Sequence, residues 1–144
     1  MPSAAITVDE MIQRLERAIA AWNRGDLDDY LTLYGDEVTL HGYSPEPMGK
    51  AAVRTFYEGI FAGLPGSQIE LVDTFGSGDR IAARFSQRGR HNGELIGMPA
   101  TGRQVELNGI TILAFRDERV IERWAAADML GLLVQIGAVT PPMP

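Results

Sequence analysis

Apolar residues recur every three to four positions in the first part of the chain, which is the spacing of a helix with one buried face. Thr7 and Glu10 precede them with the pattern of a capping box, in which each side chain satisfies a backbone N–H group of the other residue. The pattern predicts a helix that starts after Thr7 and ends at Gly25, because glycine commonly closes a helix. Its apolar positions are Met11, Ile12, Leu15, Ala18, Ile19 and Trp22.

Two more helices and a short strand are expected next. Asp26 is a suitable N-cap for a short second helix that runs through Tyr34 and is closed by Gly35. The run Val38–Tyr43 predicts a short strand. Apolar residues at helical spacing then predict a third helix over Gly49–Phe61.

The period of the pattern changes to two after Pro65, which indicates strands whose side chains alternate between two faces. Gly76–Asp79 has the composition of a hairpin turn between the first two of these strands. The predicted strands are Gln68–Thr74, Arg80–His91, Arg103–Phe115 and Val120–Asp128. Met129–Gly137 is expected to form a short closing helix.

This order of elements predicts an α+β fold, in which helices cover one face of a curved antiparallel sheet. The sequence contains no internal repeat, linker or low-complexity segment. A length of 144 residues suits one domain with a real core and room for a small-molecule cavity. We expect a single domain over Val8–Val139, followed by a tail over Thr140–Pro144.

Composition and charge narrow the possible partners. A net charge of −6 argues against a nucleic-acid surface, which needs clustered Lys and Arg to neutralise phosphates. The chain has no cysteine, which excludes disulfides and cysteine nucleophiles. No apolar run approaches the length of a membrane span, and Met1–Glu10 does not have the pattern of a signal peptide. We therefore expect a soluble, cytoplasmic protein without a membrane partner.

The last predicted strand carries the strongest candidate for a catalytic residue. Five alternate residues are expected to share one of its faces: Val120, Glu122, Trp124, Ala126 and Asp128. An indole, a methyl group and a carboxylate on one face are typical of a pocket wall with one acid in it, which suits general acid/base chemistry. Asp128 has a second interpretation, because it directly precedes the closing helix and would serve as its N-cap.

Other polar and aromatic side chains are candidates for contact with a ligand. Phe85, Gln87 and His91 share one face of the second long strand, so they are expected to point into the concavity of the sheet. His91 and Gln87 would then polarise a carbonyl or stabilise an enolate. His41 is expected near the mouth of the cavity. Two histidines without a consistent carboxylate spacing do not form a metal site, so no metal is expected.

The helices supply aromatic residues that are mostly core by composition, although some must line any pocket beneath the helices. These residues are Trp22, Tyr30, Tyr34, Phe56 and Tyr57.

One strand is apolar on both of its predicted faces. Ile110 and Ile112 have the opposite parity to Leu113 and Phe115, so the long strand presents apolar side chains outward as well as inward. An outer apolar patch on a sheet commonly marks a subunit interface. We therefore expect a homodimer or a higher oligomer such as a homotetramer.

Four stretches together match a known family pattern. They are Leu33–Val38, Gly49–Tyr57, the pair Gly89–Glu94 with Gly97–Arg103, and the ending Glu122-x-Trp124-x-x-x-Asp128-x-x-Gly131-Leu132-Leu133-x-Gln135-x-Gly137. The chain resembles the SnoaL-like polyketide cyclase group of the NTF2-like superfamily over about Val8 to Val139. The resemblance implies a cone fold, with three N-terminal helices over the concave face of a curved antiparallel sheet and a short C-terminal helix.

The resemblance also implies a reaction. Characterised members close a polyketide ring by intramolecular aldol condensation without metal or cofactor, and their acid/base is the aspartate of the Trp-x-x-x-Asp segment, here Asp128. The leading hypothesis is a cyclase of this kind acting on a hydrophobic, carbonyl-rich small molecule. His91 and Gln87 would stabilise the oxyanion. The residues expected to hold the substrate are Trp124, Gln87, His41, Tyr34, Phe56, Tyr57 and Phe85.

Two alternatives remain open at the level of sequence. The same pocket would serve a small-molecule-binding protein without catalysis, and this alternative predicts tight binding without turnover. It would also serve a hydrolase that activates water, and this alternative predicts a second polar group positioned to hold that water.

Overall fold

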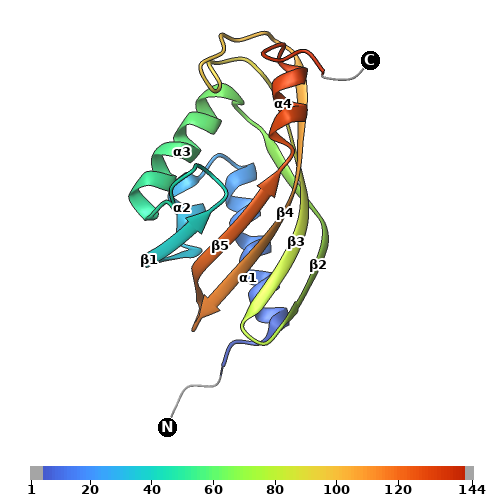
Figure 1. Ribbon diagram of the computed structural model, residues 1–144. Coiled ribbons are helices and arrows are strands. Elements are labelled where there is room, and N and C mark those ends of the chain that lie inside the picture. The colour runs from blue at the N-terminus through green and yellow to red at the C-terminus, as the bar shows by residue number, and fades with distance from the viewer. Residues whose placement is uncertain (1–4, 142–144) are drawn as a thin grey trace.

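The computed structural model of the protein describes residues 5–141 (Figure 1). The elements in chain order are α1 (Val8–Asn23), α2 (Leu27–Leu31), β1 (Tyr34–His41), α3 (Lys50–Gly63), β2 (Gln68–Ser77), β3 (Arg80–Arg90), β4 (Gln104–Arg116), β5 (Arg119–Ala127) and α4 (Met129–Gln135). Residues 1–4 lie outside the described residues, and so do residues 142–144 of the expected C-terminal tail. Within residues 5–141, no helix is long and apolar enough to cross a bilayer.

The strands form one five-stranded sheet in the order β1-β5-β4-β3-β2. The sheet curves, α1, α2 and α3 lie on one side of it, and α4 packs against β4 at one end (Figure 1). The α+β fold predicted from the sequence is confirmed. One pairing differs from the prediction, because β1 runs parallel to β5 while the other pairs are antiparallel.

The first helix begins as the sequence predicts. The hydroxyl of Thr7 accepts a hydrogen bond from the backbone N–H of Glu10 at 3.1 Å, and the Glu10 carboxylate accepts the reciprocal bond from the N–H of Thr7 at 3.4 Å. The capping box is therefore confirmed. The helix buries an unbroken stripe of side chains that includes Met11, Leu15 and Trp22.

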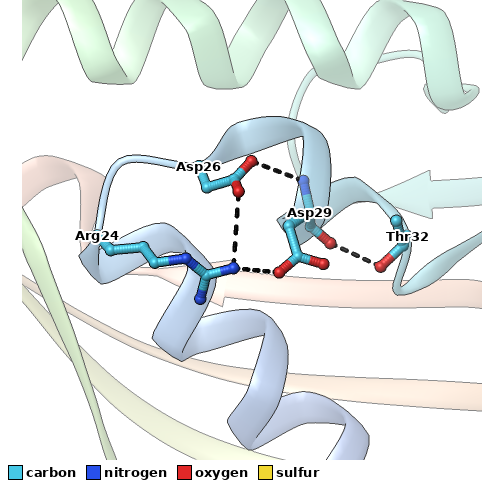
Figure 2. A network of polar contacts seen from close by, with 4 residues as sticks. All are labelled: Arg24, Asp26, Asp29 and Thr32. Atoms are coloured by element: carbon cyan, nitrogen blue, oxygen red, sulfur yellow. Dashed lines mark hydrogen bonds and ion pairs between the residues drawn. The ribbon is translucent and has the colours of Figure 1, made fainter.

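A polar network fixes the corner between α1 and α2 (Figure 2). The Asp26 carboxylate accepts a hydrogen bond from the Asp29 N–H at 3.0 Å and caps α2 as predicted. Arg24 pairs with both carboxylates, and the Thr32 hydroxyl donates to the Asp29 carbonyl at 2.6 Å. This network holds the short helix that carries the buried Tyr30.

The second helix is shorter and the first strand begins earlier than predicted. The sequence pattern extended the helix through Tyr34 and started the strand at Val38, whereas β1 begins at Tyr34. Tyr34 pairs with Val120 of β5, a residue far away in the sequence. Tertiary pairing therefore overrides a weak local helical preference here.

The last strand contains an irregularity that reverses the predicted faces. Phe115 pairs with Val120, but Ala114 pairs with Glu122, so Ile121 is an extra residue in β5. Beyond this bulge the parity of the strand changes. Arg123, Ala125 and Ala127 pair with Leu113, Thr111 and Gly109 of β4, and paired residues lie on the same face of a sheet. Arg123, Ala125 and Ala127 therefore face the helices. The sequence pattern predicts that Glu122, Trp124 and Asp128 lie on the inner face of the strand. This prediction is wrong for Glu122 and Trp124, whose side chains face outward.

The buried apolar side chains form two cores. The larger lies between α1, α3 and the sheet and includes Met11, Leu15, Val53 and Leu113. The smaller lies under α4 and consists of Leu64, Leu95, Val105, Leu132 and Ile136. Ile60 of α3 packs against both cores.

Candidate functional site

An apolar cavity of about 380 Å³ lies between the helices and the concave side of the sheet, and residues of both cores line it. This volume falls in the range of about 300–1,000 Å³ that is usual for small-molecule sites. Trp22, Tyr57, Phe85 and Leu132 contribute walls from α1, α3, β3 and α4. Arg123 is the one charged side chain among the described residues that line it.

Arg123 is held at the cavity by neutral hydroxyl groups. Its side chain is almost fully buried, and its Nε donates to the Thr111 hydroxyl at 2.9 Å. Its Nη1 donates to the hydroxyls of Tyr34 at 2.7 Å and of Tyr30 at 3.0 Å. The Thr111 hydroxyl in turn donates to the Trp124 carbonyl at 2.7 Å. Within residues 5–141, Arg123 takes part in no ion pair with a carboxylate.

The tyrosine hydroxyls continue this network toward the cavity. The oxygen atoms of Tyr34 and Tyr57 lie 2.7 Å apart, and those of Tyr57 and Tyr43 lie 3.1 Å apart. Tyr30, Tyr43 and Tyr57 line the cavity, while Tyr34 lies behind them and is fully buried. The network thus links the guanidinium of Arg123 to hydroxyls at the cavity wall.

Burial and charge shift the pKa values within this cluster. Burial opposes ionisation of Tyr30, but the attraction of Arg123 and hydrogen bonds from its neighbours outweigh burial and lower the pKa of Tyr30 below 10.0. Burial raises the pKa of Tyr34 and of Tyr57 well above 10.0, and it also raises the pKa of Tyr43. Burial disfavours the charged form of Arg123, yet the surrounding tyrosine oxygens outweigh it and raise the pKa of Arg123 well above its ordinary value. Arg123 therefore stays positively charged.

A second polar group lies on a different wall of the cavity. The Gln87 amide donates to the Ser67 hydroxyl at 3.1 Å, and the Trp22 indole N–H donates to the same oxygen at 3.2 Å. Gln87 is buried and lines the cavity, so its position on the inward face of β3 is as predicted. Its amide oxygen makes no hydrogen bond within residues 5–141, which leaves it as an acceptor for a ligand.

Asp128 caps the last helix at the rim of the cavity. Its Oδ1 accepts a hydrogen bond from the Gly131 N–H at 2.8 Å, so the N-cap interpretation is confirmed. Its neighbours Ala127 and Met129 line the cavity, whereas Asp128 itself is exposed. Its Oδ2 makes no hydrogen bond among residues 5–141. A role as the catalytic acid/base stays a prediction.

The other predicted ligand contacts divide into two groups. Phe56, Tyr57 and Phe85 line the cavity, and Tyr34 supports it through its bonds to Arg123 and Tyr57.

Trp124 and His41 are not part of the cavity wall. They stack on each other on the outer face of the sheet with ring centres 5.5 Å apart. His41 Nε2 lies 2.7 Å from Glu122 Oε2, and the Arg80 guanidinium lies over the Trp124 ring at 5.2 Å. The expectation that Trp124 is the pocket aromatic is corrected by the bulge at Ile121, which turns its side chain outward.

His91 is also absent from the wall of the cavity. It is fully buried, and its Nδ1 lies 2.9 Å from the Thr101 hydroxyl. Its Nε2 has no hydrogen-bond partner among the described residues. The expectation that its ring opens into the concavity is therefore not met, because the strand ends at Arg90 and the backbone of His91 pairs with Gly102 and Arg103 in the following loop.

Sequence reasoning missed Arg123 and Tyr43. Arg123 lies between Glu122 and Trp124 in the sequence, but strict alternation places its side chain on the outer face of the sheet. No local signal in the sequence marks the bulge. Tyr43 follows β1, in a loop whose path depends on the bridge between Leu40 and Met48. Within residues 5–141, no group of three or more His, Asp or Glu side chains is arranged to hold a metal ion.

Comparison with known proteins gives consistent matches. The family model described as SnoaL-like polyketide cyclase matches residues 12–136. The chain is 29% identical over 136 residues to the aklanonic acid methyl ester cyclase DnrD of Streptomyces peucetius, with 90% of this chain and 92% of that protein covered. It is also 29% identical over 141 residues to the aklanonic acid methyl ester cyclase DauD of Streptomyces sp. (strain C5), with 90% and 83% covered.

Solved structures share the fold, and their descriptions name more than one activity. AclR, a putative hydroxylase from Streptomyces galilaeus, superimposes with a TM-score of 0.87 at 27% identity and covers 93% of this chain and 100% of its own. IdmH, a putative polyketide cyclase from Streptomyces antibioticus, superimposes with a TM-score of 0.77 at 25% identity and covers 88% of this chain and 98% of its own.

Proposed function

The chain belongs to the SnoaL-like polyketide cyclase family, and on that premise we propose that it closes a ring in a hydrophobic, carbonyl-rich small molecule by an intramolecular aldol reaction. The observation that carries the proposal is the apolar cavity of about 380 Å³, whose wall combines aromatic side chains with few polar groups. Such a wall suits a flat polyketide, because apolar contacts fold the molecule while polar groups orient its oxygens.

Asp128 is the proposed acid/base. Its free Oδ2 at the rim would remove a proton from a carbon next to a carbonyl, which generates an enolate. The enolate carbon then attacks a second carbonyl of the same molecule, and the protonated Asp128 returns its proton to the resulting alkoxide, which regenerates the carboxylate. These steps conserve every atom of the substrate and need neither a redox step nor a cofactor.

The cavity wall would supply the rest of the rate enhancement. Holding two ends of one molecule in contact contributes up to about 7–11 kcal/mol to the lowering of a barrier. Phe56, Tyr57 and Phe85 are positioned to hold the substrate folded, and the Gln87 amide is available to a substrate polar group. His91 is left out of this proposal, since its side chain is fully buried away from the cavity wall.

Turnover is tested with the compound for which the relatives are named. The purified protein is incubated with aklanonic acid methyl ester and with smaller 1,3-dicarbonyl compounds, and products are separated by liquid chromatography with mass detection. An aldol closure gives a product of unchanged mass with a new retention time. In D₂O, removal and return of the carbon-bound proton adds deuterium to the recovered substrate or product.

A non-catalytic binding protein is the second candidate. The observation in its favour is that no carboxylate and no histidine stand among the described residues that line the cavity. This alternative predicts that these compounds bind but give neither a product of unchanged mass nor deuterium incorporation faster than in a protein-free control.

A second copy of the chain is the proposed partner of the outer face of the sheet. Phe75 of β2 and Ile110 and Ile112 of β4 lie on that face, and their exposed fractions are 69%, 57% and 41%. The strand β3 lies between β2 and β4, and its Ala82 pairs with both Phe75 and Ile112. Cross-strand pairing places Ile112 beside Trp124. Exposed apolar patches of this kind commonly mark subunit interfaces, which supports a homodimer.

A further inference from the structure

The hydrogen-bond donors of Arg123 are only partly matched by acceptors. Arg123 has five N–H donors and no acceptor. Three of these N–H groups serve Thr111, Tyr34 and Tyr30 through Nε and Nη1. The two N–H groups of Nη2 make no hydrogen bond within residues 5–141, and the Nη2 atom is not fully buried. They are therefore open to the cavity that Arg123 lines.

The tyrosine hydroxyls present further donors to the cavity. Since Arg123 can only donate, the oxygens of Tyr34 and Tyr30 accept from it. The Tyr34 proton can reach Tyr57 at 2.7 Å or Tyr30 at 3.5 Å, and the shorter contact favours Tyr57. Tyr57 then directs its own proton to Tyr43 at 3.1 Å. Tyr43 lies at the end of this chain and lines the cavity, so its proton is available to a ligand.

The cluster also carries an unbalanced positive charge. No carboxylate lies among the described residues that line the cavity or bond to Arg123. A buried charge without a counterion is costly, and a ligand that carries the opposite charge would offset this cost. The raised pKa of Arg123 keeps the charge in place.

We infer that Arg123 and Tyr43 form an anion-binding subsite, which takes a delocalised oxygen anion attached to an apolar ring system. This inference rests on the proposed function, because it specifies the substrate of the same cavity. Two sources share the chemistry: a carboxylate, or the enolate of a 1,3-dicarbonyl, in which the charge is spread over two oxygens. In an aldol closure the enolate would be the nucleophile, so Arg123 would stabilise its oxygen while Asp128 handles the carbon-bound proton.

Matched pairs of probes separate anion recognition from apolar binding. 2-Naphthoate and 2-naphthamide have nearly the same shape but differ in charge, and calorimetric titration gives their affinities for the full chain. The enolate source is tested with 1,3-indanedione against 1-indanone at pH 8, since only the diketone ionises there. We expect the anion of at least one pair to bind about tenfold or more tightly than its neutral partner, the effect of one charge-assisted hydrogen bond.

Two variants with the same change of charge identify the residue responsible. Arg123→Met should bring the affinity ratio of anion to neutral probe close to one. Arg88→Met removes an arginine from the outer face of β3, where it pairs with Glu106, and should leave the ratio unchanged. Circular dichroism reports whether each variant is folded.

A milder variant decides the matter if Arg123→Met does not fold. Tyr43→Phe removes only the terminal hydroxyl, and we expect it to weaken the anion about three- to tenfold while the neutral probe changes less than about twofold. Any one of four results would overturn the inference. The first two are equal affinities within both pairs of probes and no measurable binding of either anion. The other two are an anion preference that survives Arg123→Met and an equal loss of affinity for both probes in Tyr43→Phe. Ring closure without anion preference would leave the proposed function standing, whereas anion preference without turnover would remove the proposed function alone.

Discussion

A single buried guanidinium controls the electrostatics of the cavity. Arg123 donates to Tyr30 and Tyr34, and its field lowers the pKa of one tyrosine while burial raises the others. The pKa of Tyr30 is thus shifted in the opposite direction to the pKa values of Tyr34, Tyr43 and Tyr57. Ordinary titration of isolated side chains would not produce this pattern.

The pKa shifts predict an alkaline loss of stability. Tyr34 and Tyr57 stay protonated in the folded protein while the unfolded chain releases their protons near pH 10.0. Their contribution is fully present below that pH and is lost as the pH rises above it toward the raised folded pKa. Tyr57→Phe should make the decline of the free energy of unfolding shallower by up to about 1.4 kcal/mol per pH unit.

Tyr30→Phe provides the comparison of opposite sign. The lowered pKa of Tyr30 adds stability as the pH rises from its folded pKa to 10.0 and adds no slope above that pH. Tyr30→Phe should therefore remove this gain below pH 10.0 and leave the decline above pH 10.0 unchanged. Urea unfolding between pH 7 and pH 11 measures both slopes. Identical slopes for the wild type and the two variants would contradict this description of the cluster.

At the scale of elements, the closing helix depends on a glycine. Asp128 caps α4 through the Gly131 N–H, and a Cβ atom at position 131 would overlap the Asp128 carboxylate. Alanine is favoured over glycine in a helix by up to about 1 kcal/mol. Here the added Cβ atom would displace the Asp128 carboxylate, and the helix would lose a cap that contributes a similar free energy. We expect Gly131→Ala to bring no net stabilisation.

Gly59 is the matched control, because it lies in α3 and a Cβ atom added there would have no neighbour within 4 Å. Gly59→Ala should stabilise the protein by up to about 1 kcal/mol in urea unfolding. In an Asp128→Ala background, Gly131→Ala should become stabilising, because the clash is gone. Equal effects of the two glycine substitutions in the wild-type background would rule out the proposed contact.

Predictions from the sequence are correct where interactions between neighbouring residues determine the structure, and they are wrong where pairing between distant segments determines it. Thr7, Asp26 and Asp128 were identified as helix caps because a cap depends on three or four neighbouring residues. The inner face of β3 was also predictable, since its alternation is unbroken and Gln87 follows it to the cavity. The outward turn of Trp124 was not predictable, because the bulge in β5 exists only through pairing with β4.

At the scale of the whole molecule, the sheet has one face covered by helices and one face exposed. The exposed face carries Phe75, Ile110 and Ile112, and the proposed homodimer would bury them. Ile112→Glu places a charge in the middle of that face and should convert the dimer to a monomer, as measured by light scattering coupled to size-exclusion chromatography. Ala52→Glu adds the same charge on an exposed part of α3 and should leave the dimer intact. A wild-type monomer would contradict the proposal.

The catalytic proposal depends most directly on Asp128. Asparagine caps a helix about as well as aspartate, so Asp128→Asn should leave the free energy of unfolding within about 0.5 kcal/mol of the wild type. The same variant cannot accept a carbon-bound proton, so the rate of ring closure, or of deuterium incorporation from D₂O, should fall by about 10²- to 10⁴-fold. Unchanged stability with this loss of rate is the expected result. A variant that keeps the wild-type rate would contradict it and would leave Asp128 as a helix cap alone.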